Sequence, residues 1–156
     1  NDIVFQVADD REDFYLEVAK KGSRNMRASL ANLSPMPETI FNALVENADS
    51  YLVGRLIANE DAAAYMTYEM VADFVKSGDI AALQAFIHGV GNLCHLEGID
   101  EKLEKLAEHR EPDIRCDVAS KEEIPREIIE RLAKDSDLSV RQCALENLGY
   151  RDEVDE

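Results

Sequence analysis

The chain has 156 residues, of which 46% are hydrophobic and 32% are charged, a composition typical of one folded globular domain rather than a disordered chain. Asp and Glu outnumber Lys and Arg by 33 to 17, so the formal net charge is −16. A field of this sign repels nucleic acid and anionic membranes, and it favours a basic protein or peptide as partner. Residues 79–156 carry 20 acidic and 10 basic side chains, against 13 and 7 in residues 1–78.

The cysteines bear on the compartment of the protein. Cys94, Cys116 and Cys143 are odd in number and lie far apart in the sequence. This usage is typical of reduced thiols, and it predicts a cytoplasmic protein. No apolar run reaches the roughly 18 to 20 residues that a membrane-spanning helix requires.

Apolar residues recur at helical spacing along most of the chain, and alternating strand patterns are scarce, which predicts an all-α fold. Pro37 and Pro125 are each expected to open a helix, because proline is tolerated in the first turn. Asp79 is expected to cap the helix that follows Ser77 and Gly78. In chain order, the main predicted helices cover residues 25–33, 50–58, 62–76, 79–89, 112–120 and 138–147. Residues 151–156 are predicted to form an acidic tail.

A register of 26 residues relates several of these helices. Leu106–Arg115 aligns with Leu132–Arg141 at this offset, and the same frame recurs in residues 18–30 and 44–56. One helical pair cannot bury its apolar stripe alone, whereas stacked pairs share a continuous core. We therefore expect a single domain over residues 1–156, folded as a curved α-solenoid of about five helical pairs. The expected repeats are 13–37, 38–61, a longer middle repeat 62–98, 99–124 and 125–150.

Residues 132–147 read Leu-Ala-x-Asp-x-Asp-x-x-Val-Arg-x-x-Ala-Leu-x-Asn. This pattern resembles the leucine-rich repeat variant and, more broadly, short HEAT-like repeats. Residues 106–119 form a second copy, and residues 16–32 and 42–59 are weaker ones. The resemblance covers about two-thirds of the chain, and it implies a right-handed stack of helix pairs. Some members of the variant family hold an iron–sulfur cluster on grouped cysteines, which this chain lacks.

An arginine recurs in the repeat, as Arg27, Arg115 and Arg141. These side chains could bind an anionic ligand. A structural role is favoured, because a guanidinium group bonds both carboxylates and exposed helix carbonyls of a neighbouring repeat. Asp135 and Asp137 are natural partners for them.

Residue types that carry catalysis or bind metals are not arranged in a recognised spacing. His88, Cys94, His95 and His109 are the nearest approach to a soft-ligand group, but the chain has no CxxC or HExxH pattern. We therefore expect no catalytic residue, no cofactor, no metal site and no enzymatic activity.

The second helices of successive pairs are expected to line one face of the solenoid. On that face Ile114 and Val140 turn inward, which directs the neighbouring carboxylates to solvent. Two aromatic residues of the middle repeat are candidate interface anchors. The expected partner-binding residues are Glu111, Asp113, Asp117, Asp137 and Glu146, with Tyr65 or Tyr68 as the anchor.

Two binding functions follow from this surface. The first is a non-catalytic interaction module that holds a basic protein or peptide. The second is an immunity protein or antitoxin that inhibits a basic, nuclease-like toxin. A scaffold would bind at moderate strength, whereas an inhibitor would bind at nanomolar affinity or tighter and abolish an activity. The oligomeric state is left open by the sequence.

Overall fold

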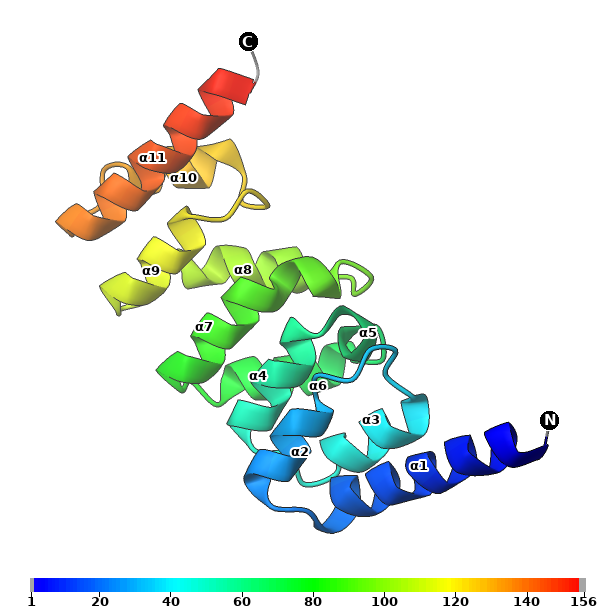
Figure 1. Cartoon of the computed structure of the whole chain (residues 1–156). Coiled ribbons are helices and arrows are strands. Elements are labelled where there is room, and N and C mark those ends of the chain that lie inside the picture. The colour runs from blue at the N-terminus through cyan, green and yellow to red at the C-terminus, as the bar shows by residue number, and fades with distance from the viewer. Residues whose placement is uncertain (1, 155–156) are drawn as a thin grey trace.

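The computed structural model describes the backbone of residues 2–154 and the side chains of residues 11–153 (Figure 1). Over this range the chain forms eleven α-helices and one 3₁₀ helix, with no strand. The all-α prediction is therefore confirmed.

In chain order the helices are α1 (Asp2–Lys21), α2 (Arg24–Leu30), α3 (Glu38–Val45), α4 (Ser50–Ala58), α5 (Glu60–Ala63), α6 (Tyr68–Lys76), α7 (Ile80–Gly89), the 3₁₀ helix η1 (Val90–Leu93), α8 (Ile99–Leu106), α9 (Pro112–Ala119), α10 (Arg126–Leu132) and α11 (Leu138–Val154). The predicted helix 50–58 coincides with α4. Pro37 and Pro125 directly precede α3 and α10, as predicted. Asp79 occupies the N-cap position of α7, but its side chain makes no capping hydrogen bond.

Three predicted boundaries differ from the structure. The helix expected over residues 25–33 ends three residues earlier, at Leu30 of α2. The helix expected over residues 62–76 is interrupted between α5 and α6, because the Thr67 side chain accepts a hydrogen bond from the Met70 amide and starts a new helix. Of the acidic tail expected over residues 151–156, residues 151–154 form the last turn of α11, and residues 155–156 lie outside the described residues. Arg151 anchors this turn, since its guanidinium donates to the Lys121, Glu122 and Ile124 carbonyls.

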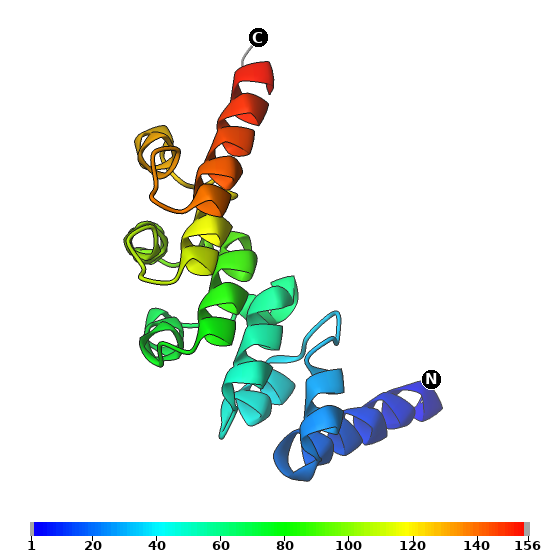
Figure 2. The same ribbon diagram turned by 90° about the vertical axis from the view of Figure 1, so that its left-hand side faces the viewer.

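Five helices stand next to one another in a row. This inner row consists of α2, α4, α7, α9 and α11, and each of them contacts the next. Helices α1, α6, α8 and α10 each pack against the inner-row helix that follows them in the chain, and α3 packs on α1. Figure 2 shows α6, α8 and α10 to the left of the inner row, whose right side is uncovered. Toward the N-terminus the chain bends to the right, so the uncovered side lies inside the bend.

A continuous apolar core lies between the two sets of helices. Ile114 and Val140, which were predicted to turn inward, are fully buried, as are Phe41 and Phe86. Burial of one such side chain contributes roughly 1.5 to 3 kcal/mol. Among the described residues, no helix combines the length and hydropathy that crossing a membrane would take.

Two asparagines connect successive helical pairs. The Asn59 amide nitrogen donates to the carbonyls of Ala31 and Leu33, at 2.8 and 2.9 Å. The Asn147 amide nitrogen donates to those of Ala119 and Lys121, at 2.7 and 3.0 Å. In both places the asparagine satisfies carbonyls at or just beyond the end of a preceding inner-row helix, where intrahelical partners are lacking.

Candidate functional site

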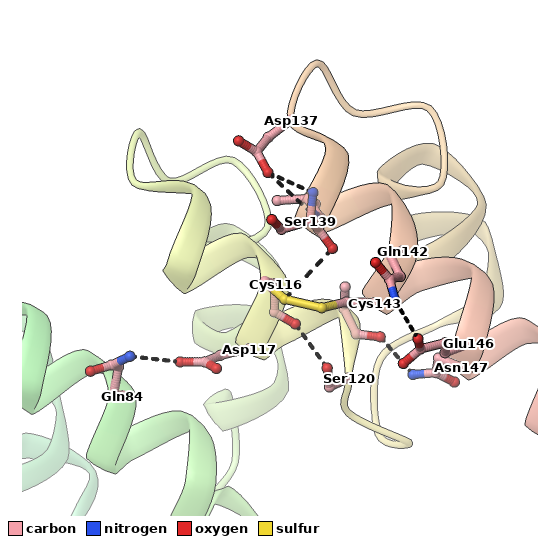
Figure 3. Close-up of a disulfide and its surroundings, with 12 residues drawn as sticks. Gln84, Cys116, Asp117, Ser120, Asp137, Ser139, Gln142, Cys143, Glu146 and Asn147 are labelled. Carbon is pink, nitrogen blue, oxygen red and sulfur yellow. Dashed lines mark hydrogen bonds between the residues drawn. A yellow bond between two sulfur atoms is a disulfide. The ribbon is translucent and has the colours of Figure 1, made fainter.

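Helices α9 and α11 carry the carboxylates that were predicted to bind a partner. Asp113 is exposed on α9. Asp117 lies one turn later and is partly covered by α7, because Gln84 donates a 3.1 Å hydrogen bond to its Oδ2 and His88 Nε2 lies 3.8 Å from its Oδ1 (Figure 3). Glu146 is exposed on α11 and accepts a hydrogen bond from Gln142, one turn earlier.

The two residues predicted to rim this face differ in their contacts. Asp137 directly precedes α11, and its Oδ1 accepts hydrogen bonds from the Ser139 and Val140 amides. This carboxylate is therefore occupied by capping the helix. Glu111 precedes α9 without capping it, and its side chain lies 3.5 Å from Arg110 Nε.

A disulfide joins α9 to α11 within the same surface. It links Cys116 and Cys143, whose Cα atoms are 5.7 Å apart (Figure 3). The prediction of three reduced thiols is therefore wrong for two of them, and Cys94 is a free, exposed cysteine. The physical reason is the stacking of α9 on α11, which places facing positions of two repeats side by side. The 26-residue register could have indicated that the two helices stack, but it aligns Cys116 with Gln142, one residue before Cys143.

The two candidate tyrosines lie elsewhere. Tyr65 is 37% exposed, and its hydroxyl donates to the Met36 carbonyl. Its ring packs against Phe41 in a tilted arrangement, with 5.4 Å between the centroids. Tyr68 is 40% exposed, and Lys102 Nζ of α8 lies 4.8 Å from the centre of its ring. These contacts place Tyr68 among the outer helices α6 and α8. The structure therefore does not bring either tyrosine to the carboxylates of α9 and α11.

Sequence reasoning missed a pocket of about 920 Å³ between α2, α4 and α7. We call it the α4 groove, because α4 forms its floor. Small residues lie along it, with Gly54 from α4 and Ala81 and Ala85 from α7. Asp79 and Glu60 also line it. The sequence contains a weak signal, since small residues recur at helical spacing in both helices, but only the packing shows that they meet.

A stacked trio of side chains forms one wall of the α4 groove. The Arg24 and Arg55 guanidinium carbons lie 4.7 and 5.9 Å from the centre of the Tyr51 ring. Arg24 also pairs with Asp49 at 2.8 Å, and Arg55 donates a 2.6 Å hydrogen bond to Asn32. Both cations therefore already have polar partners within the chain.

The recurring arginines connect turns and helix ends. Arg115 donates to both Asp135 carboxylate oxygens at 2.9 Å, and the two side chains are only 13% and 12% exposed. The hydrogen bond from Arg115 lowers the pKa of Asp135, and the same bond raises the pKa of Arg115. Arg27 donates to the Leu44 carbonyl at 2.8 Å, and Arg141 to the Asp135 carbonyl at 2.7 Å. These contacts agree with the structural role expected for all three.

The soft-ligand residues are dispersed. His95 Nε2 lies 3.3 Å from the Met66 carbonyl, and His109 Nδ1 accepts a hydrogen bond from the Glu111 amide. His88 faces Asp117 on the inner row. Within the described part of the chain, no three His, Cys, Asp or Glu side chains are grouped in a way that would hold a metal ion.

The chain matches no protein-family model, no curated protein and no solved structure. The resemblance of residues 132–147 to helical repeats therefore rests on the sequence pattern.

Proposed function

We propose that the chain is a non-catalytic protein-binding module that docks a basic protein or peptide on the uncovered side of its inner row. The observation that supports this most directly is the exposure of Asp113 on α9 and of Glu146 on α11, two neighbouring helices of the inner row, in a chain of net charge −16. Carboxylates on an open surface attract a basic partner and accelerate its encounter.

The architecture proposed for this module is a curved, HEAT-like α-solenoid of five helical pairs that resembles the leucine-rich repeat variant. Recurrent polar contacts support it. Asn59 and Asn147 each reach carbonyls 28 and 26 residues earlier in the chain. Arg115 and Arg141 each donate to the carbonyls six and five residues before them. Asn92 reaches 35 residues back to the Ile57 carbonyl, in agreement with a longer middle repeat.

The test starts from a partner that the chain retains at low salt and releases at high salt. The purified partner is then titrated with the double variant Asp113→Lys/Glu146→Lys. We expect its affinity to fall more than tenfold at low salt and less at high salt, because screening weakens exposed charges. Asp117 is left intact, since its hydrogen bond with Gln84 belongs to the fold.

The matched control is Asp73→Lys/Glu101→Lys, which makes the same charge change at exposed positions of the outer helices α6 and α8. Equal losses in the two double variants would mean that net charge alone governs binding, and would overturn a specific site on α9 and α11.

An immunity protein or antitoxin against a basic, nuclease-like toxin is the second candidate. The observation that favours it is the concentration of acidic residues in positions 79–156, which include α9 and α11. An inhibitor of this kind would abolish the partner's nuclease activity at a one-to-one ratio, whereas a scaffold would leave the activity unchanged.

The cytoplasmic location is likewise a proposal from sequence, and the Cys116–Cys143 disulfide weighs against it. Disulfides persist in oxidising compartments and are rare in the cytoplasm. Thiol labelling in intact cells tests this point: labelling of all three cysteines supports a reducing compartment, and labelling of Cys94 alone contradicts it.

A further inference from the structure

The floor of the α4 groove is made by an unusually close approach of two parallel helices. A Cβ on Gly54 would lie 2.9 Å from the Cβ of Ala85, and one on Gly89 would lie within 3.4 Å of the Ile57 backbone. Gly54 of α4 faces Ala85 of α7, and Ile57, later in α4, faces Gly89, later in α7. The two helices therefore run in the same direction. The parallel course places Asp79 beside the start of α4, whereas Glu60 follows the end of α4. The two carboxylates therefore mark opposite ends of the groove.

The charged side chains of the α4 groove differ in whether they already have a partner within the chain. Among the described residues, the Asp79 and Glu60 carboxylates have no hydrogen-bond or ion-pair partner, although both line the pocket. Arg24 and Arg55 already contact the Tyr51 ring and a polar partner each. Arg55 Nε has no hydrogen-bond partner, but this atom is buried and out of a ligand's reach. The accessible charged groups without a partner in the described chain are therefore the two exposed carboxylates, and the arginines form a wall that holds Tyr51.

The middle of the groove is lined by small apolar residues, in contrast to its charged ends. Ala58 and Ala81 are exposed, and Ala85 is half-buried. Methyl groups and a glycine leave room for a peptide backbone to approach, and they offer no hydrogen bond to a bulky polar side chain. The floor suits a chain of small residues.

We propose that the α4 groove binds a short extended peptide segment of the partner protein, with two basic residues four positions apart and small residues between them. The nine residues of α4 span about 13 Å, and four extended residues cover about the same length. One basic side chain then pairs with Asp79 and the other with Glu60. This inference rests on the proposed function, since it assigns to the same basic partner a second contact on the inner row.

The test uses the acetylated and amidated peptide Gly-Lys-Ala-Ala-Ala-Lys-Gly, titrated into the isotope-labelled full chain and followed by NMR. We expect saturable shifts at the Gly54, Ala81 and Ala85 amides. The isomer Gly-Lys-Lys-Ala-Ala-Ala-Gly has the same charge and the wrong spacing, and should bind at least fivefold more weakly. A peptide with glutamate in place of both lysines should not bind.

Two variants locate the site within the groove. Ala81→Trp fills the exposed floor and should abolish the saturable shifts, with Ala81→Ser as its matched control. Asp79→Asn/Glu60→Gln removes both charges and should weaken binding about tenfold. Asparagine is itself a good N-cap, so this variant retains the start of α7. Circular dichroism and thermal unfolding confirm that each variant is folded.

Equal binding of the two lysine isomers, shifts unaffected by Ala81→Trp, or tighter binding of the glutamate peptide would each overturn the proposal. The last result would assign the groove to an anion held by Arg24 and Arg55. If the peptide fails while Asp113→Lys/Glu146→Lys still weakens the partner, the groove assignment alone is wrong. If neither set of variants affects the partner, the proposed function is wrong as well.

Discussion

The two ends of the inner row differ in how much of their surface is already occupied by contacts within the chain. At the N-terminal end, α2, α4 and α7 leave a pocket of about 920 Å³ lined by small residues and charged side chains. At the C-terminal end, α9 and α11 are joined by a disulfide, and the Arg115–Asp135 pair ties α9 to the turn before α11. The carboxylates there lie on a surface in which many polar groups already have partners.

This difference shows how one helical frame produces either a groove or a closed surface. At inner-facing positions α4 and α7 place glycine and alanine, whereas α9 and α11 place cysteine, aspartate and glutamate. The glycine and alanine residues leave open space over α4 and α7. The larger side chains of α9 and α11 fill this space with a disulfide and side-chain hydrogen bonds. We therefore expect the C-terminal end to resist unfolding and the N-terminal end to adapt to a ligand.

Removal of the disulfide should have the largest effect on this contrast. The two cysteines are 27 residues apart, and a cross-link over such a loop stabilises a protein by about 3.5 kcal/mol through the unfolded chain. Cys116→Ser/Cys143→Ser should therefore lower the free energy of unfolding by that amount, measured by urea titration without reductant. The control is Cys94→Ser, which should be neutral. If added dithiothreitol leaves the wild-type midpoint unchanged, the bridge contributes nothing to stability.

The recurring arginine should contribute more to the free energy of unfolding at the C-terminal end, as Arg115, than at the N-terminal end, as Arg27. Arg115→Ala leaves the largely buried Asp135 carboxylate without its partner, and should cost about 3 kcal/mol. Arg27 bonds only backbone carbonyls, so Arg27→Ala should cost about 1.5 kcal/mol. Urea unfolding of both variants checks the ratio. Equal costs would show that the carbonyl contacts, rather than the ion pair, carry the stability.

Asn59 and Asn147 make the same bridge at opposite ends of the row, but Asn59 has an additional role. Each bridges two carbonyls at the same separations along the chain. Asn59 also caps α5, whereas Arg151 donates to the Lys121 carbonyl alongside Asn147. Asn59→Ala should therefore cost about 3 kcal/mol and Asn147→Ala about 2 kcal/mol. Thermal unfolding of the two variants, with the exposed Asn42→Ala as control, measures the difference. Equal losses would show that the cap of α5 contributes nothing to stability.

Local features of the fold could be predicted from the sequence. The proline signals that precede α3 and α10 depend on residues within one turn, and they place the starts of these helices well. The inward-facing positions also follow from local spacing, since Ile114 and Val140 are buried as expected. In each case one helix carries the information.

Features that depend on two or more helices were missed. The α4 groove requires residues from α2, α4 and α7, and the disulfide requires α9 to stack on α11. One local feature was missed as well: the Thr67 side chain caps α6, and this contact interrupts an otherwise helical apolar pattern. The positions of Tyr65 and Tyr68 also depend on several helices. The exposure of a side chain can be estimated from one helix, but the face of the molecule on which it lies depends on how the neighbouring helices pack.

The smallest expected effect concerns the acid stability of the C-terminal end. Arg115 lowers the pKa of Asp135 below its ordinary value of about 3.9. A carboxylate whose pKa is lower in the folded state stabilises the protein above its unfolded-state pKa, and this contribution is lost as the pH falls through the folded-state pKa. Asp135→Asn should therefore cost about 1.5 kcal/mol at pH 7. The cost should decrease as the pH falls below about 4, until the wild-type carboxyl is protonated in the folded state as well. Urea unfolding of both proteins between pH 2.5 and 7 follows the two stabilities as they converge. A constant difference across this range would show that Asp135 stabilises the turn through its shape and hydrogen bonds, and that its charge contributes nothing to the contrast between the two ends.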